Sequence, residues 1–453
     1  MKNRRLLASA ASIGLVLALV LSGCGSPSIP GRVVSERRIT QIDSGFVEGS
    51  LTVSRDIRRI AYFAETDDGQ FAVIDGTKGK QYDAAGDLTF SPDSQRVAYL
   101  AITGDKWFAV VDGIEEKPYD GIGQGTLTFS PDSQRLAYVV LAGDRWFAVV
   151  DGIEEKQYDA IASLTFSPDS QRVAYLAQMD NKWFSVVDGV EGKQYDIVGA
   201  SIFSPDSQRL AYGAQASNRQ FVVVNGVEGK QYDGIGDGSL TFSPDSQRLA
   251  YFAQTEGKWL AVVDGIDGRQ YDAAGELTFS PDSQRVAYGA QAGDKVFTVV
   301  DGIDGQQYDG AGGLIFSPDS QRVAYMAMSG DRQFAVVNGI EEKQYDGAGG
   351  LVFSQNSQRL AYLAEIGEKW FAVVDSTEGK QYDAAAGLIF SPDSQRLAYF
   401  AQAGDEWFDV VDGIEGRKYS GLSEGGLAFD SASSLHYLAL DGNKVYLVEE
   451  TVG

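Results

Sequence analysis

Short apolar runs separated by polar turn residues repeat along most of this chain. In residues 88–125 the apolar runs are Leu88–Phe90, Val97–Ala101 and Trp107–Val111, and Lys117–Tyr119 is a weaker fourth run. Runs of three to six residues with Asp-Gly or Gly-Asp between them are typical of β-hairpins, and no helical spacing occurs. The pattern therefore predicts four short antiparallel strands in each repeat.

The turn after the first run provides the most regular signal. Ser91-Pro92-Asp93-Ser94-Gln95-Arg96 returns in near-identical form along the chain. The eleven copies, three of them weaker, begin at Ser54, Ser91, Ser130, Ser167, Ser204, Ser243, Ser280, Ser317, Ser354, Ser391 and Asp430. Four short strands in a period near 40 residues are typical of a β-propeller blade. The fold class is therefore expected to be all-β, a β-propeller of about eleven four-stranded blades.

The two ends of the repeat region complement each other. The last copy has no counterpart of the fourth run, whereas Arg38–Asp43 precedes the first copy and parallels Lys230–Asp233. An N-terminal strand that pairs in the last blade would remove exposed strand edges. We therefore expect one ring closed in this way, with two stacked rings or an open superhelix as the alternatives, because propellers usually have four to eight blades.

The repeat resembles the TolB-type WD-like propeller repeat, in which Ser-Pro-Asp-Gly and a basic residue precede a short apolar strand. Here Ser94 and its counterparts stand at the usual Gly position, so the turn is expected to differ locally. The resemblance covers residue 51 to about residue 447 and implies a fold rather than an activity.

The N-terminus is typical of an export signal. Lys2, Arg4 and Arg5 precede a mostly apolar stretch, Leu6–Val20, which is too short for a spanning helix. Leu21-Ser22-Gly23-Cys24 resembles the bacterial lipobox, and Cys24 is the single cysteine of the chain. We expect residues 1–23 to be a lipoprotein signal peptide, 24–32 the lipidated Cys24 with a short tether, and 33–453 the propeller. This predicts an exported protein at the cell surface or in the periplasm, anchored to a membrane by lipid on Cys24. The alternative is a cleavable signal with an incidental cysteine.

The net charge of −25 disfavours nucleic-acid binding, because it repels phosphate backbones. It also disfavours a flat approach to anionic lipid, which leaves the acyl chains as the attachment.

The residue types provide little for catalysis. His436 is the single histidine, no cysteine or histidine cluster is present to bind a metal, and no serine-hydrolase elbow is found. The aspartates of the repeated turn recur in register, which favours turn capping over an asymmetric acid–base pair. They are Asp93, Asp132, Asp169, Asp206, Asp245, Asp282, Asp319 and Asp393. We expect no enzyme, no cofactor, no metal site and no catalytic residue.

Six tryptophans begin the third run of their repeats, and packing between blades is preferred over a platform for glycans or peptides. They are Trp107, Trp146, Trp183, Trp259, Trp370 and Trp407. The connections from second to third run and from fourth run to the next first run vary most, so the binding surface is expected among them, with its residues unknown.

These observations predict a non-catalytic, membrane-anchored scaffold of the cell envelope that binds a protein or an envelope polymer. The alternative is a propeller that binds or senses a glycan or small ligand, and a remote alternative is a hydrolase or lyase that uses carboxylates alone.

Overall fold

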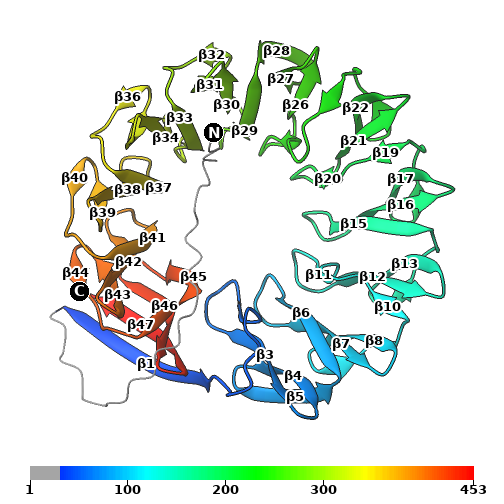
Figure 1. Ribbon diagram of the computed structural model, residues 1–453, viewed down its shortest axis with the longest axis horizontal. Helices are drawn as coiled ribbons and strands as arrows, with labels where there is room; N and C mark the ends of the chain where they lie inside the picture. Colours follow the sequence, from blue (N-terminus) through cyan, green and yellow to red (C-terminus); the bar gives the residue numbers. More distant parts are fainter. Residues whose placement is uncertain (1–30) are drawn as a thin grey trace. The chain divides into compact units, whose positions relative to one another are not determined.

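The structure is a computed structural model that describes residues 31–453 (Figure 1). The predicted signal peptide, Cys24 and nearly all of the predicted tether lie outside the described residues. The described chain is all-β, with 47 strands in eleven sheets and no helix. Accordingly, residues 31–453 provide no helix of the length and hydropathy needed to span a bilayer.

Each sheet is one blade, in which first, second, third and fourth strands pair antiparallel in that order. The first strands, three of them in two pieces, are β2 (Thr52–Val53), β6 (Ala84–Phe90), β10 with β11 (Gly121–Ile122, Thr128–Phe129), β15 (Ala160–Phe166), β19 with β20 (Ile197–Val198, Ile202–Phe203), β24 with β25 (Gly234–Ile235, Thr241–Phe242), β29 (Ala273–Phe279), β33 (Gly310–Phe316), β37 (Gly347–Phe353), β41 (Ala384–Phe390) and β45 (Gly421–Phe429). The second strands are β3 (Ile60–Thr66), β7 (Val97–Thr103), β12 (Leu136–Ala142), β16 (Val173–Met179), β21 (Leu210–Ala216), β26 (Leu249–Thr255), β30 (Val286–Ala292), β34 (Val323–Ser329), β38 (Leu360–Ile366), β42 (Leu397–Ala403) and β46 (Ser434–Asp441).

The third strands are β4 (Gly69–Ile74), β8 (Lys106–Val111), β13 (Arg145–Val150), β17 (Lys182–Val187), β22 (Arg219–Val224), β27 (Lys258–Val263), β31 (Lys295–Val300), β35 (Arg332–Val337), β39 (Lys369–Val374), β43 (Glu406–Val411) and β47 (Lys444–Val452). The fourth strands are β5 (Thr77–Tyr82), β9 (Ile114–Glu115), β14 (Ile153–Glu154), β18 (Val190–Glu191), β23 (Val227–Glu228), β28 (Ile266–Tyr271), β32 (Ile303–Asp304), β36 (Ile340–Glu341), β40 (Thr377–Glu378), β44 (Ile414–Glu415) and, in the last blade, β1 (Arg32–Gln41).

Blades are numbered 1 to 11 from β2–β5 to β45–β47 with β1. The chain divides into two compact units, unit 2 with residues 42–270 and unit 1 with the remainder. Unit 2 therefore holds blades 1 to 6, and unit 1 holds blades 7 to 11. Within each unit the blades stand side by side, with first strands on the concave side and fourth strands on the convex side (Figure 1).

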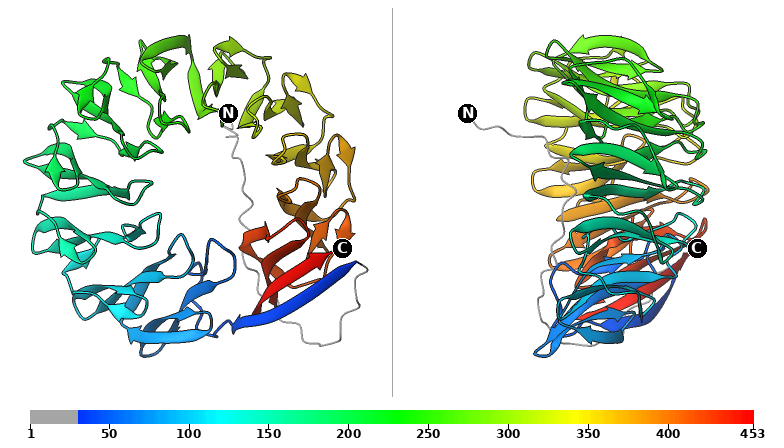
Figure 2. Two further views of the ribbon diagram at one scale, coloured as in Figure 1. Left: turned by 180° about the vertical axis from the view of Figure 1, so that it is seen from behind. Right: turned by 90° about the vertical axis from the view of Figure 1, so that its right-hand side faces the viewer.

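The eleven four-stranded blades and the N-terminal strand in the last blade confirm the predicted fold class. β1 pairs antiparallel with β47, from Arg32 opposite Val452 to Gln41 opposite Lys444. The two strands run side by side in Figure 2. Glu36 of β1 accepts hydrogen bonds from Arg417 and Tyr419 of blade 10. Glu154 of β14 likewise accepts hydrogen bonds from Lys117 and Tyr119 between blades 2 and 3. β1 therefore takes the place of a fourth strand and makes the same bonds to the preceding blade.

The fourth strand lies earlier in blade 2 than the sequence indicated. Asp112 and Gly113 both have positive φ, at 52° and 81°, as a type I′ hairpin turn requires. The chain therefore returns at once as Ile114–Glu115, and Tyr119 of the expected run forms an isolated bridge with Trp107. Pro118 has no N–H to donate, which limits pairing beside it.

The repeated serine turn joins neighbouring blades. Ser91 Oγ donates to Asp93 Oδ1 at 2.6 Å, and the Asp93 N–H donates to Ser133 Oγ of the next blade at 2.9 Å. Ser94 and Ser133 have φ of 64° and 65°, the conformation that favours the glycine of the resembling family. Serine keeps that turn shape here, and its hydroxyl links one blade to the next.

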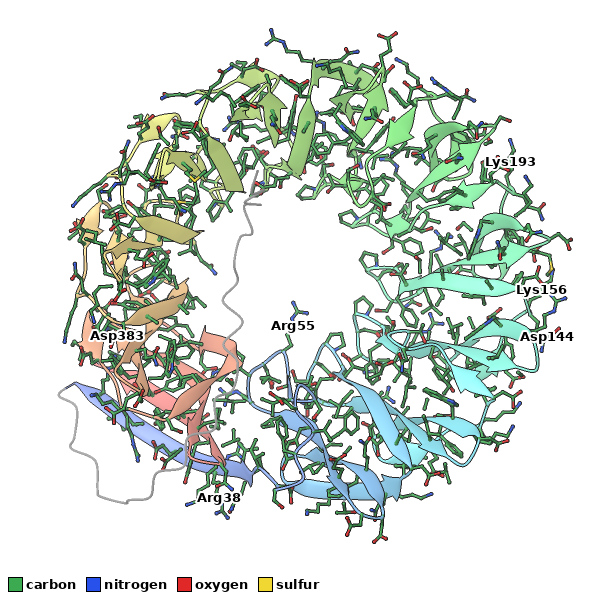
Figure 3. The ribbon with its side chains drawn as sticks, viewed as in Figure 1. Arg38, Arg55, Asp144, Lys156, Lys193 and Asp383 are labelled. Atoms are coloured by element: carbon green, nitrogen blue, oxygen red, sulfur yellow. The ribbon has the colours of Figure 1, made fainter. Side chains whose placement is uncertain are left out.

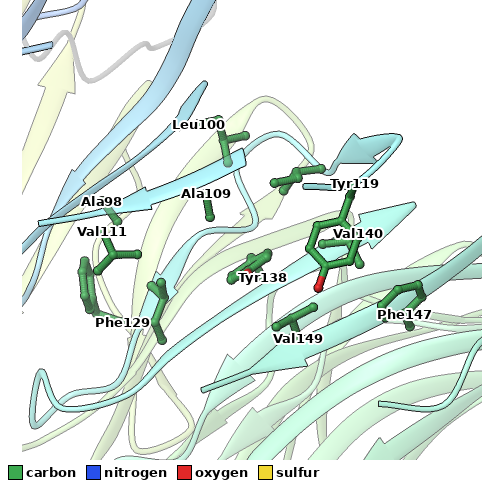
Figure 4. Close-up of a cluster of buried hydrophobic side chains, with 12 residues drawn as sticks. Ala98, Leu100, Ala109, Val111, Tyr119, Phe129, Tyr138, Val140, Phe147 and Val149 are labelled. Atoms are coloured by element: carbon green, nitrogen blue, oxygen red, sulfur yellow. The ribbon is translucent and has the colours of Figure 1, made fainter. Parts of the chain in front are cut away.

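Apolar side chains fill the space between blades. Between blades 2 and 3, Leu100, Val111, Phe129, Tyr138 and Phe147 are buried in one cluster (Figure 4). Because neighbouring blades within a unit cover both faces of a sheet, second and third strands carry consecutive apolar residues, as at Val97–Ala101 and Phe108–Val111, rather than alternating ones. The core is thus a series of similar layers between blades.

Candidate functional site

The connections between blades gather at one end of each sheet, which we name the connections face. It consists of the turns from second to third strands and the links from each fourth strand to the next first strand. The Gly104 N–H in such a turn donates to Asp83 in such a link at 2.6 Å, and Gly143 and Asp120 do the same at 2.7 Å. The opposite end, with the serine turns and the Asp-Gly hairpins, is named the turn face.

The repeated polar groups of the connections face are used between blades. Asp120 accepts from Lys106 of blade 2 at 2.6 Å as well as from the Gly143 N–H of blade 3. Both bonds stabilise its charged form, and they lower the pKa of Asp120 below the ordinary value. Such aspartates hold the blades in register, which leaves the variable residues beside them to distinguish one blade from another.

Variation on this face lies mainly at turn tips. Five blades have Gly-Asp at the tip, as at Gly104-Asp105, whereas blades 4, 5 and 6 have Asp180-Asn181, Ser217-Asn218 and Glu256-Gly257. In these three turns both tip residues have positive φ, from 50° to 76°. The three tips are consecutive in unit 2 and offer carboxylate, amide and hydroxyl groups of different kinds.

The first strands of blades 1, 3, 6 and 11 carry two extra residues each. In blades 1, 3 and 6 the exposed tips of these insertions are Glu48-Gly49, Gln124-Gly125 and Asp237-Gly238. The insertion of blade 3 is held by Gly123 N to Val139 O at 2.8 Å and by Thr126 Oγ1 to Gly123 O at 2.6 Å. The insertions of blades 1, 3 and 6 belong to unit 2, and that of blade 11 belongs to unit 1. Arg55, which replaces the turn proline in blade 1, extends from the same concave side (Figure 3).

The tryptophan position lies between blades, in agreement with the packing interpretation. Trp107 and Trp183 pack against the buried clusters that join their blades to the next. Where glutamine replaces tryptophan, its Oε1 accepts an N–H from the first strand of the following blade, at 3.0 Å from Gln70 to Ala85 and 2.7 Å from Gln220 to Ile235. Tryptophan and glutamine at this position therefore both join one blade to the next.

The boundary between blades 7 and 8 has neither a tryptophan nor a glutamine at this position. In blade 7 Val296 occupies the tryptophan position, and Gly289 stands where blades 2, 4 and 9 have leucine. The resulting pocket, about 200 Å³, lies between β29–β31 and β33 and is mostly apolar. Glu276, an exposed residue with φ of 57°, is among its lining residues. It is smaller than typical ligand pockets, which begin near ~300 Å³.

A charged cluster is buried in the last blade, and we name it the Arg32 network. Arg32 Nη1 donates to Asp409 Oδ2 at 2.5 Å and to Glu450 Oε2 at 2.9 Å, and the side chains of all three are fully buried. The Tyr437 hydroxyl lies 3.0 Å from Asp409 Oδ1 and 2.9 Å from Glu450 Oε1. Arg32 Nη2 also donates to the Ile414 carbonyl at 2.6 Å.

Two carboxyl groups share one guanidinium in this network, and burial favours their neutral forms. Burial, together with the charge of Asp409, raises the pKa of Glu450 to about 7, although Arg32 and Tyr437 act in the opposite direction. Burial likewise raises the pKa of Asp409 against the effect of Arg32. A shifted acid pair is a common feature of catalytic sites. Here the side chains have no exposed surface, so the geometry favours a structural link between β1, β43 and β47.

The network predicts a pH dependence of the last blade. The pKa of Glu450 in the folded protein lies above the ordinary value of 4.5, so protonation of Glu450 stabilises the fold. This stabilisation is complete below about pH 4.5 and is lost as the pH rises through about 7. We expect the β1 amides to exchange at least ~10-fold faster at pH 8 than at pH 5, after correction for intrinsic exchange. Glu450→Gln should remove most of this difference, and an unchanged pH dependence would contradict the assignment.

The residues that the sequence analysis weighed as catalytic candidates have structural partners in the fold. His436 is buried, and its Nδ1 lies 3.0 Å from Asp430 Oδ2. Asp93 accepts from the Ser91 hydroxyl and the Gln95 N–H, which lower its pKa. Among residues 31–453 no group of three or more His, Cys, Asp or Glu side chains is placed to hold a metal ion. The prediction of a lipid on Cys24 concerns a residue outside this range.

Comparison with known proteins finds similarity at the level of solved structures. No family model and no curated protein matches the chain. The Dos1 propeller matches with 12% identity and a TM-score of 0.33, over 63% of this chain and 90% of that one. The β-propeller domain of the trilobed protease from Pyrococcus furiosus matches with 12% identity and a TM-score of 0.28, over 57% of this chain and 94% of that one. The GH74 enzyme of Niastella koreensis matches with 12% identity and a TM-score of 0.29, over 90% and 79%. The assignment of the fold as a propeller of eleven four-stranded blades rests on the strand pairing.

Proposed function

We propose that this protein is a non-catalytic scaffold of the cell envelope, exported and held at a membrane by lipid on Cys24. In this proposal it binds a protein partner through the connections face and the first-strand insertions of unit 2. The observation that carries the proposal is that the repeated polar residues and the variable residues have different places in the fold. Repeated polar groups bond blade to blade, and the variable residues occupy exposed tips on a rigid frame, where binding residues usually lie.

The chemistry of the tips supports a polar protein surface as the partner. Glu48, Gln124 and Asp237 in the insertions, and Asp180 and Ser217 on the turns, provide acceptors without a deep apolar pocket. Such a surface suits a partner with basic or amide side chains, bound by many modest contacts rather than by one buried anchor.

The test is crosslinking capture from envelope extract, followed by substitution of the tips. Replacing Asp180-Asn181, Ser217-Asn218 and Glu256-Gly257 by Gly-Asp gives turns that blades 2, 3, 7, 8 and 10 already use. We expect this variant to fold normally and to lose at least ~90% of the captured partner, since several polar contacts of ~1 kcal/mol each are removed.

The matched control makes equally conservative changes on the turn face. Val190→Ile and Val227→Ile convert two blades to the residue of most others, and capture should remain unchanged. Capture by the tip variant at the level of the control would overturn the proposed surface. If the captured proteins are lost when the salt concentration is raised, the capture is better explained by nonspecific attraction to the acidic chain.

The pocket beside Val296 favours a second candidate, the binding of a small ligand. Gly289→Leu places in blade 7 the side chain that blades 2, 4 and 9 have, and it should fill the pocket. Small-ligand binding that is lost in this variant while protein capture persists would support the second candidate.

A further inference from the structure

Each unit presents a row of exposed aliphatic side chains at the start of its fourth strands. In unit 1 we name Val33, Ile303, Ile340 and Ile414 the aliphatic row. Three of them are 71% to 74% exposed and Ile414 is 47% exposed. Unit 2 has its own such residues, 68% to 73% exposed, at Ile114, Ile153, Val190, Val227 and Ile266.

The fold does not require these side chains. Thr77 and Thr377 occupy the same hairpin position in blades 1 and 9, and their turns have the same Asp-first geometry with positive φ. An isoleucine that leaves about 70% of its surface in water contributes little to the core. Their recurrence near the start of successive fourth strands makes them a candidate interaction surface.

The N-terminal segment enters the fold beside this row. Arg32 Nη2 donates to the carbonyl of Ile414, and the Gly453 N–H donates to Gly31 O at 2.7 Å. Val33, the next residue of β1, belongs to the row. Only eight residues, Cys24 to Gly31, separate the proposed lipid from this point, a reach of roughly 26 Å when fully extended. A lipid on Cys24 thus keeps the turn face of unit 1 near the bilayer.

Some of the charges beside the row are paired. Lys343 bonds Glu378 at 2.6 Å and Lys380 bonds Glu415 at 2.5 Å, each across a blade boundary. Glu341 and Glu342, which follow Ile340, instead accept hydrogen bonds from the neutral side chains of Gln306 and Ser376. These acidic groups would repel anionic lipid, so the row suits zwitterionic headgroups.

We propose that the aliphatic row of unit 1 docks on the surface of a bilayer of neutral lipid, with its side chains at the level of the headgroups. The inference rests on the proposed lipid attachment at Cys24. Contact of this kind fixes the turn face toward the membrane and leaves the connections face of unit 1 directed away from it. The acyl chains provide the anchorage, and the row determines the orientation.

The experiment uses the full lipidated chain in phosphatidylcholine vesicles. Because the lipid occupies the Cys24 thiol, a nitroxide can be placed on one introduced cysteine, at Ile340 in the row or at Ile366 as the matched control. Ile366 is also an exposed isoleucine of unit 1, at the connections-face end of β38. Power saturation then compares collisions with oxygen, which enters lipid, and with a nickel chelate, which stays in water.

We expect the ratio of oxygen to nickel collisions to be at least ~3-fold higher at residue 340 than at residue 366. Changing Ile303, Ile340 and Ile414 together to threonine, the residue of blades 1 and 9, should lower that ratio for a label at Val33. Equal ratios at residues 340 and 366 would overturn the inference. Protection of residue 340 from both reagents that disappears on dilution would show a second copy on the row, and would overturn it as well.

An experiment in which Cys24 carries no lipid gives a different result from one in which only the docking of the row fails. Mass spectrometry that finds Cys24 unmodified, with the protein in the soluble fraction, would overturn the lipid attachment and this inference with it. A lipidated chain whose label at residue 340 stays in water would overturn the docking alone.

Discussion

Replacing Arg32 by methionine is expected to destabilise the last blade by about 3–5 kcal/mol, since it leaves Asp409 and Glu450 buried without their cation. Methionine retains the length of the side chain, so the loss reports on charge rather than on an empty space. Hydrogen exchange of the β1 and β47 amides measures it directly, and a loss of about 3 kcal/mol corresponds to exchange roughly 100-fold faster.

The control removes one of the two carboxyl groups instead. Asp409→Ala introduces the residue of blades 1, 2, 3, 6, 8 and 9 and leaves Arg32 paired with Glu450 alone. Asp409 is one of the causes that raise the pKa of Glu450, so its removal favours an ionised Glu450 paired with Arg32. We therefore expect less than half of the loss seen for Arg32→Met. A loss from Asp409→Ala as large as that from Arg32→Met would contradict the charge balance assigned to the network.

Gly416→Ala is expected to cost about 3 kcal/mol through a single added methyl group. A Cβ at Gly416 would overlap Asp409 Oδ1 and lie 2.7 Å from Arg32 Nη1. The φ of Gly416 is not positive, so the cost comes from the space that the network occupies. The measurement is again the exchange of the β1 amides, combined with the midpoint of thermal unfolding.

Gly379→Ala provides the matched control. Gly379 holds the same place in blade 9, where an added Cβ would lie 3.1 Å from the carbonyl oxygen of Ala372. Glu116 and Glu155 fill this place in blades 2 and 3, so a side chain is accommodated there. We expect a cost below about 1 kcal/mol for Gly379→Ala, and similar costs for the two alanines would contradict the role of the network.

The buried network also distinguishes the last blade from ten similar ones. Blades of near-identical sequence offer β1 many similar third strands to pair with, and apolar contacts alone discriminate poorly among them. A buried arginine that needs Asp409 and Glu450 favours one partner and one register, at some cost in stability. We interpret the network as the feature that directs the N-terminal strand to β47.

The functional proposal depends on sequence variation among the blades, which can be compared position by position because the repeats are so similar. When eleven copies share a scaffold, a residue common to all of them serves the blade, and a residue confined to a few can serve the partner. The links of Asp83 and Asp120 fall in the first class, and the tips at Asp180 and Gln124 fall in the second. This reasoning identified the loops from sequence, whereas the first-strand insertions became visible as a group only when their common bonding was seen.

Local patterns along the chain were enough to predict the strands and turns of this protein. The repeat length, the paired turns such as Asp112-Gly113 and the apolar runs predicted eleven four-stranded blades, because turn chemistry and strand patterning act between residues close in the chain. The missing fourth run of the last copy predicted the place of β1. One local error, the fourth strand at Lys117–Tyr119, arose because a two-residue turn brings the chain back sooner than apolar content suggests. A second was the turn at Ser94, which was expected to differ from the glycine turn of the resembling family but has a φ of 64°.

The bonds that join the blades, and the places where the blades differ in packing, follow from contacts between residues far apart in the chain. The bond from Asp93 to Ser133 spans 40 residues, and the bonds of Arg32 to Asp409 and Glu450 span 377 and 418 residues. The pocket beside Gly289 and Val296 exists only where the next blade stands against them. Spacing along a chain does not encode such contacts, and the raised pKa of Glu450 has the same origin, because burial is a property of the packed blades rather than of the residue.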